Sequence, residues 1–132
     1  MTAAQELLCN KLYKGYDTFR EVVSLKSFIR ENERISDCGD NTGEIKAMIA
    51  TQNEKLDQEC KRLVEIRSKI DKCISTIGES DLRAYMTMKY LGHMSNQDIS
   101  DQMYWSKRTC ERKHIKALDA IIASGADKIL DY

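Results

Sequence analysis

Apolar side chains recur at helical spacing along most of the chain, and clusters of turn-forming residues divide them into segments. The first segment is residues 3–34, where charged and polar residues fill the positions between the apolar ones. Its apolar positions are Leu8, Leu12, Phe19, Val22, Val23 and Ile29, with Tyr16 beside them. Spacings of three and four residues predict one long amphipathic helix. Gly15 weakens this helix and would let another helix approach it closely.

Residues 44–77 carry a stricter pattern, because apolar residues return every seven positions. The repeat consists of Ile49, Leu56, Leu63, Ile70 and Ile77, and Ile66 and Cys73 form a second row in its later half. A heptad repeat keeps one stripe facing a partner helix and predicts coiled-coil packing. The partner could be the first helix of the same chain or a helix of a second chain, and the two arrangements are compatible.

The clearest break in the pattern is residues 36–43, SDCGDNTG, which contain two glycines, two aspartates and an asparagine. These residue types are typical of turns. Asn41 followed by Glu44 resembles a capping box at the start of the second helix. Two helices of similar length joined by a short turn predict an antiparallel helical hairpin over residues 1–78.

A shorter amphipathic helix is expected after Gly78, which ends the hairpin. Ser80 is its expected N-cap and Gly92 its expected end. Between them, residues 81–91 place Leu82, Tyr85, Met86, Met88 and Leu91 close together on one face. This face would cover the helices that follow.

Two further helices are predicted by the serines that precede them. Ser95 is the expected N-cap of a helix over residues 95–104, and Ser106 is the expected N-cap of a longer helix over residues 106–123. The complete pattern predicts an all-α protein, in which a long antiparallel helical hairpin, coiled-coil-like, precedes a trihelical domain at residues 79–124. Residues 125–132 are expected to form a loosely held tail.

The longer of these two helices has a polar face and an apolar face. At about 100° per residue, one sector is expected to face the core and contains Cys110, His114, Ala117, Leu118 and Ile121. The opposite sector contains Arg108, Thr109, Arg112 and Lys116. A short helix followed by a longer one with a basic outer face is typical of the helix-turn-helix, whose second helix enters the DNA major groove.

The charge of the chain limits how such a helix could bind DNA. There are 21 basic and 21 acidic residues, so the net charge is zero and indiscriminate binding to nucleic acid is not favoured. Residues 107–116 contain five basic residues and one acidic residue. DNA binding would therefore depend on this local cluster and on its geometry.

Other kinds of chemistry receive little support from the sequence. The five cysteines lack a C-x-x-C pair and no signal peptide opens the chain, so reduced thiols in a cytoplasmic protein are expected. No apolar run approaches the length of a membrane span. Cys110 and His114 have half of a metal-site spacing, but a packed core pair is expected instead. We expect no cofactor, no metal and no enzymatic activity, because no phosphate-binding loop or nucleophile-with-base motif is present.

Residues 79–118 combine an apolar helix ending near Leu91, the motif S-x-x-D-I-S at Ser95–Ser100, a corner containing Trp105, and a basic helix ending in K-A-L. With this combination of motifs the segment resembles region 4 of sigma-70-type transcription factors. Within this superfamily the chain is most similar to phage-encoded regulators of Gram-positive hosts, of the ArpU/RinA type. Two positions depart from the family pattern. Tyr104 stands where glycine is common because the backbone often needs a positive φ, and Lys113 stands where an apolar residue is usual.

The resemblance implies a sequence-specific duplex DNA-binding transcriptional regulator that acts in the host cytoplasm. The positions that match base or flanking phosphate contacts are Ser106, Lys107, Arg108, Glu111 and Arg112. The positions that match the start of the first helix, which touches the DNA backbone, are Ser95, Asn96 and Gln97. Lys107 and Lys116 are expected to meet phosphate.

The hairpin would then serve to form a homodimer or oligomer, or to contact host RNA polymerase. Two alternatives remain open at this point. One is a small packaging subunit of the terminase type, which would recognise phage DNA and assemble as a ring. The other is a helical interaction protein that does not bind DNA.

Overall fold

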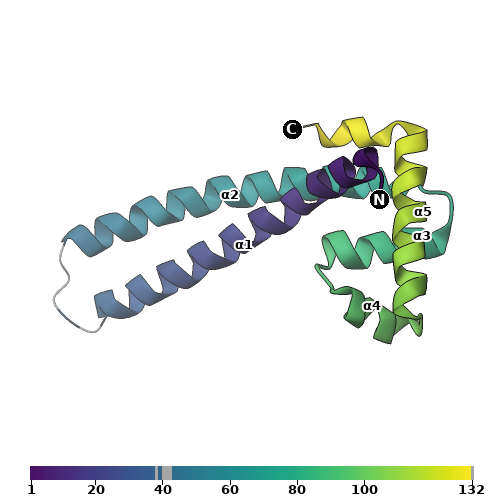
Figure 1. Ribbon diagram of the computed structural model, residues 1–132. Helices are drawn as coiled ribbons and strands as arrows, with labels where there is room; N and C mark the ends of the chain where they lie inside the picture. Colours follow the sequence, from purple (N-terminus) through teal and green to yellow (C-terminus); the bar gives the residue numbers. More distant parts are fainter. Residues whose placement is uncertain (38, 40–42, 132) are drawn as a thin grey trace. The chain divides into compact units, whose positions relative to one another are not determined.

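A computed structural model describes residues 1–37, 39 and 43–131, and every element in this part of the chain is helical (Figure 1). The elements in order are α1 (Ala3–Asp37), α2 (Gly43–Ser75), α3 (Ser80–Met86), the π-helical η1 (Thr87–Leu91), α4 (Asn96–Met103), α5 (Lys107–Ser124) and the 3-10 helix η2 (Ala126–Leu130). The predicted all-α fold class is confirmed. No helix within the described ranges is long and apolar enough to cross a membrane. The predicted cap at Asn41 lies outside the described residues.

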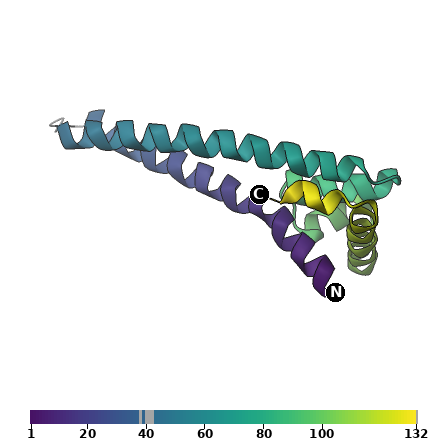
Figure 2. The same cartoon turned by 90° about the horizontal axis from the view of Figure 1, so that it is seen from above.

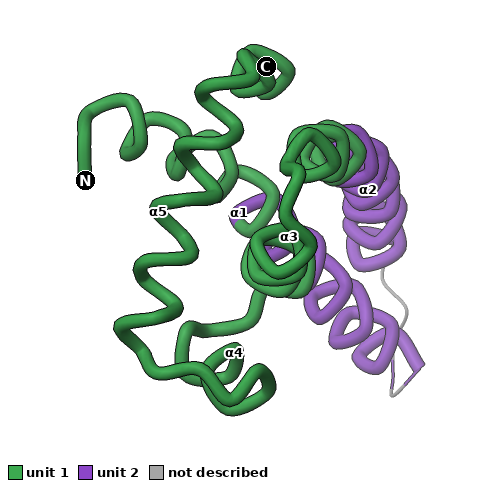
Figure 3. The backbone as a smooth tube through the Cα atoms, turned by 90° about the vertical axis from the view of Figure 1, so that its right-hand side faces the viewer, with its two compact units in different colours: residues 1–16, 66–132 green, residues 17–65 purple. Residues whose placement is uncertain are grey.

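The chain divides into two compact units, and the division cuts through the two long helices (Figure 3). Unit 1 contains residues 1–16 and 66–132, and unit 2 contains residues 17–65. This division differs from the boundary expected at residue 78. The physical reason is that the first turns of α1 and the last turns of α2 supply buried apolar residues to the same core as the shorter helices.

Unit 1 holds the main hydrophobic core. Its fully buried side chains include Leu12, Ile70, Cys73, Tyr85, Met86, Ile99, Cys110, Leu118, Ile121 and Leu130. α3 and α4 both pack on α5, which is the helix that most of the short elements contact. Near its N-terminus α1 diverges from the end of α2 (Figure 2). A little further along α1 the two helices come close at Gly15, where an added Cβ would lie 2.8 Å from Cδ1 of Ile70. The predicted role of Gly15 in close helix approach is therefore confirmed.

Unit 2 is built from the remaining parts of α1 and α2, which run antiparallel. Along this part of α1 the buried residues are Thr18, Val22 and Ile29. The heptad residues Ile49, Leu56 and Leu63 of α2 are only partly buried. Large apolar side chains also remain exposed in this unit, and they are Val23, Phe28, Ile35, Met48 and Val64. The two helices therefore bury one narrow seam between them.

The helix after Gly78 begins and ends differently from the expected regular helix. Ser80 is its first residue, Glu79 holds the N-cap position, and no side chain caps it, so the predicted Ser80 cap is wrong. The last five residues form the π-helix η1, in which the N–H of Gly92 donates to the carbonyl oxygen of Thr87 at 2.9 Å. A Cβ at Gly92 would lie 2.8 Å from the Met88 carbonyl oxygen. Glycine is thus required here by close backbone packing.

The C-terminal tail is firmly packed, which corrects the expectation that it is loosely held. Ala126 and Leu130 of η2 are buried, and Leu130 is fully so. The thiol of Cys73 donates a hydrogen bond to the Ala126 carbonyl oxygen at 2.9 Å. Nζ of Lys11 lies 2.6 Å from a carboxylate oxygen of Asp131. These contacts attach the tail to α1 and α2.

Candidate nucleic-acid interface

Ser95 and Ser106 are the N-caps of α4 and α5, as predicted. The Ser95 hydroxyl accepts the backbone N–H of Asp98 at 3.1 Å, and the Ser106 hydroxyl accepts the backbone N–H of Thr109 at 3.1 Å. Each bond satisfies a backbone donor that the first helical turn would leave unpaired. The start of α5 is therefore fixed by residues within the candidate interface.

The corner between these helices has a left-handed backbone at Tyr104, with φ 56° and ψ 35°. The Tyr104 N–H donates to the carbonyl oxygen of Ser100, and so does the N–H of Trp105, at 3.2 Å. In the opposite direction, the Ser100 hydroxyl donates to the Trp105 carbonyl oxygen. The corner thus has the positive φ that the resemblance implied for this position, although the residue is not glycine.

The two faces of α5 separate as the sequence predicted. Cys110, His114, Ala117, Leu118 and Ile121 are all buried. On the outer face Arg108, Arg112 and Lys116 are exposed and Thr109 is partly exposed. We call Arg108, Thr109, Arg112 and Lys116 the outer ridge. A shallow surface hollow lies along it and is also lined by Ser106, Glu111 and Ile115. Three cationic side chains of the outer ridge are therefore accessible to an anionic ligand.

The ammonium group of Lys113 is held by contacts within the protein. Nζ of Lys113 forms an ion pair with the carboxylate of Asp81 on α3, and it lies 5.2 Å from the centroid of the Trp105 ring. The hydrogen bond from Lys113 holds the pKa of Asp81 below its ordinary value. Lys113 thus connects α5 to α3 and to the corner, and it adds little to the charge of the outer ridge.

The other residues predicted to contact DNA differ in their exposure and in whether their side chains form hydrogen bonds within the protein. Lys107 and Glu111 are exposed. The amide of Gln97 donates to the Asp101 carboxylate at 2.9 Å on the exposed surface of α4. Asn96 is partly buried, and its Oδ1 accepts hydrogen bonds from the Tyr85 hydroxyl at 2.7 Å and from Nζ of Lys89 at 3.4 Å. The carbonyl end of Asn96 is therefore used within the protein.

A buried polar cluster lies beneath α5 and was not predicted from the sequence. Nε2 of His114 lies 2.6 Å from the Tyr90 hydroxyl and 3.8 Å from Sγ of Cys9. Burial, with a smaller effect from the positive charge of Lys89, lowers the pKa of His114 to about 4. Burial also raises the pKa of Tyr90 above its ordinary value. At neutral pH Tyr90 is therefore protonated and His114 is uncharged, and the tautomer of His114 decides which of the two donates the hydrogen bond.

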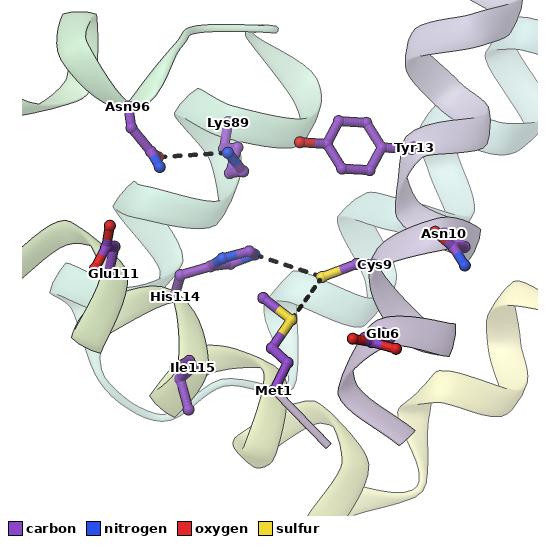
Figure 4. A pocket seen from close by; sticks show the side chains of 10 residues that line it. All are labelled: Met1, Glu6, Cys9, Asn10, Tyr13, Lys89, Asn96, Glu111, His114 and Ile115. Atoms are coloured by element: carbon purple, nitrogen blue, oxygen red, sulfur yellow. Dashed lines mark hydrogen bonds between the residues drawn. The ribbon is translucent and has the colours of Figure 1, made fainter. Parts of the chain in front are cut away.

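Two members of this cluster, Cys9 and His114, line an open pocket of about 570 Å³ within unit 1. Figure 4 shows His114 and Met1 directed toward Cys9, and Lys89 directed toward Asn96. Cys9 and His114 are far apart in the sequence, so no local motif could have indicated that they meet. The Tyr90 hydroxyl lies closer to Nε2 of His114 than the Cys9 thiol does, at 2.6 Å against 3.8 Å. Among the described residues, no group of three or more His, Cys, Asp or Glu side chains could hold a metal ion.

Comparison with known proteins places this all-helical chain in a family. The model of a family described as a protein of unknown function, DUF1492, matches residues 39–121. This match covers more than half of the chain, and the chain belongs to the DUF1492 family. The matched range includes all of α2, α3, η1 and α4, and most of α5. No curated protein and no solved structure matches the chain.

Proposed function

We propose that this protein is a sequence-specific duplex DNA-binding regulator of the phage type, and that α5 reads the major groove. In this proposal α3 with η1, α4 and α5 form a trihelical helix-turn-helix domain, and the long helices form its hairpin. The observation that carries the proposal is the outer ridge itself. It presents three cations on the exposed side of a helix whose opposite side is completely buried, and that helix follows a short capped helix and a tight corner.

The residues of the outer ridge have distinct expected roles. Arg108 and Arg112 are one helical turn apart, and arginine can donate two hydrogen bonds to O6 and N7 of guanine, which is worth about 1–3 kcal/mol of discrimination. Lys107 and Lys116 would contact phosphates, which sets affinity and salt dependence without reading sequence. At the start of α4, Ser95 and Gln97 would lie at the DNA backbone.

A partner for the hairpin would compensate for the small size of the DNA-binding part. A single module of this kind buries about 600–1,000 Å² of protein surface on DNA, which gives weak binding. Unit 2 exposes five large apolar side chains, and these are suited to a second copy of the chain or to host RNA polymerase. A second DNA-binding module, or a tethered polymerase contact, would raise the effective affinity.

The test uses a double variant of the outer ridge. Arg108→Ala with Arg112→Ala should weaken binding to a selected duplex by at least about a hundredfold, because both base contacts are lost. Both side chains are exposed, so helical content and Tm should not change. The duplex is selected with wild-type protein from random-sequence fragments, and affinity is measured by gel shift at fixed salt.

The matched control is Arg30→Ala with Arg34→Ala, which removes the same charge from exposed positions of α1 in unit 2. It should bind the selected duplex with nearly wild-type affinity. Equal affinities for wild type and the outer-ridge variant would contradict the proposal. Wild-type protein that shows no salt-sensitive DNA binding would favour the alternative of a helical interaction protein.

A further inference from the structure

Tyr104 combines a left-handed backbone with an exposed aromatic side chain. Its backbone is left-handed, with φ 56°, a conformation that L-residues other than glycine, asparagine and aspartate seldom adopt. Its side chain is 94% exposed, the most exposed of the large apolar side chains described. The ring therefore buries almost no surface that could stabilise the strained backbone.

The backbone at this corner is imposed by its neighbours. Ser100 receives the N–H groups of both Tyr104 and Trp105, and its hydroxyl is bonded to the Trp105 carbonyl oxygen. Trp105 packs against the core with Lys113 over its ring. The corner would keep this conformation with glycine at residue 104, where the positive φ carries no steric cost. Stability of the fold therefore does not explain a tyrosine here.

The position of Tyr104 suggests what the ring is for. It lies in the corner before α5, two residues before the Ser106 cap and four before Arg108 of the outer ridge. A tyrosine has an apolar ring that can lie against deoxyribose and a hydroxyl that can donate to a phosphate oxygen. A strained residue that is fully displayed beside a candidate binding surface is more readily explained by a ligand than by packing.

From this juxtaposition we infer that Tyr104 contacts the sugar–phosphate backbone of bound duplex DNA beside the groove that α5 enters. This inference rests on the proposed function. Because the contact is made to the DNA backbone, it raises affinity for every sequence equally. Because tyrosine is uncharged, it does not contribute to counterion release.

The experiment measures stability and DNA affinity in the same variants. Tyr104→Gly and Tyr104→Asn both suit a left-handed backbone, so each should raise Tm by about 2–4 °C. Both should weaken binding by about tenfold, as expected for loss of a hydrogen bond and its ring contact. The loss should be equal for a duplex selected by wild-type protein and for a scrambled duplex of the same length. The slope of log affinity against log salt should not change.

Two phenylalanine variants isolate the hydroxyl group. Tyr104→Phe should lose part of the affinity and keep the wild-type Tm, because the ring and the backbone strain remain. The matched control is Tyr13→Phe, on α1, where the ring is 43% exposed and stacks edge-on against Tyr90. Tyr13→Phe should leave DNA affinity unchanged.

Each result that opposes these expectations has a separate meaning. If wild-type protein binds DNA and Tyr104→Gly binds equally well, the inference is overturned and the proposed function stands. If neither Tyr104→Gly nor Tyr104→Asn raises Tm, the backbone is not strained and the inference is also overturned. If wild-type protein binds neither duplex, the proposed function fails and the inference fails with it.

Discussion

Units 1 and 2 are built on the same two long helices, but they bury the same repeat to different degrees. Ile70 in unit 1 is fully buried, whereas Ile49, three heptads earlier on the same stripe of α2, is partly exposed. In unit 1 the short helices add further layers around the ends of α1 and α2. In unit 2 the described residues offer only the two helices, which cover one seam. A heptad repeat therefore indicates which residues share a face, and the number of packing elements decides how deeply they are buried.

The prediction with the largest expected effect compares Ile70 with Ile49. Ile70→Ala should lower the free energy of unfolding by about 3 kcal/mol, because it removes buried methylene and methyl groups and leaves a cavity. Ile49→Ala should cost only about 1 kcal/mol, since part of that side chain already meets solvent. Urea unfolding followed by circular dichroism measures both. Equal losses would indicate that a second copy covers Ile49 in solution, and would break the contrast between the units.

The second effect is a pH dependence that belongs to unit 1. The pKa of His114 is lowered to about 4 in the folded protein, against about 6.5 when unfolded. The unfolded chain therefore binds more protons between these values, so stability is complete above pH 6.5 and falls as pH decreases. The loss between pH 7.5 and pH 5 should be about 2 kcal/mol.

The control for this effect is His114→Gln, which has no titrating group. Its free energy of unfolding will be lower than that of wild type at pH 7.5, but it should change less between pH 7.5 and pH 5. Parallel pH profiles for the two proteins would show that His114 does not carry the dependence.

The smallest expected effect is in unit 2. There the contribution of a titrating group to stability increases as pH falls, whereas the contribution of His114 decreases. A hydrogen bond with Glu21, then burial, and then repulsion between the two carboxylates raise the pKa of Glu59 above its ordinary value. The folded state therefore binds the proton more tightly, and the pair becomes less unfavourable as pH falls. Glu59→Gln should stabilise the protein at pH 7 by up to about 0.5 kcal/mol, with a smaller gain near pH 4.

Amide hydrogen exchange along α2 can locate this gain. Glu54→Gln removes an exposed carboxylate from the same helix and serves as the control. Slower exchange around residue 59 in Glu59→Gln only would support the assignment. Similar exchange in both variants would mean that the carboxyl pair has no effect on local stability.

Local signals in the sequence predicted much of the fold. The positions of the two long helices and of α4 and α5, the Ser95 and Ser106 caps and the inner face of α5 were predicted, because each depends on residues within a few positions of one another. The positive φ at Tyr104 agreed with the resemblance to the sigma factor region. The outer ridge could also be predicted, since exposure on a helix follows from periodicity once the buried face is known.

Features that depend on distant residues could not be predicted in this way. The ion pair between Asp81 and Lys113 and the meeting of Cys9 with His114 join helices that are far apart in the chain. The burial of Leu130 depends on a surface made by other elements. The grouping of residues 1–16 with residues 66–132 could not be predicted for the same reason, because periodicity shows a continuous helix and does not reveal which core each part of it joins.

The burial of Leu130 also has a consequence for how the protein is made. Leu8, in the first turns of α1, and Leu130, in η2, belong to one hydrophobic cluster. During synthesis α1 emerges early, yet its apolar face cannot be fully covered until η2 has left the ribosome. Completion of unit 1 must therefore follow translation of nearly every residue shown here, and until then the nascent chain exposes apolar surface that the folded protein covers.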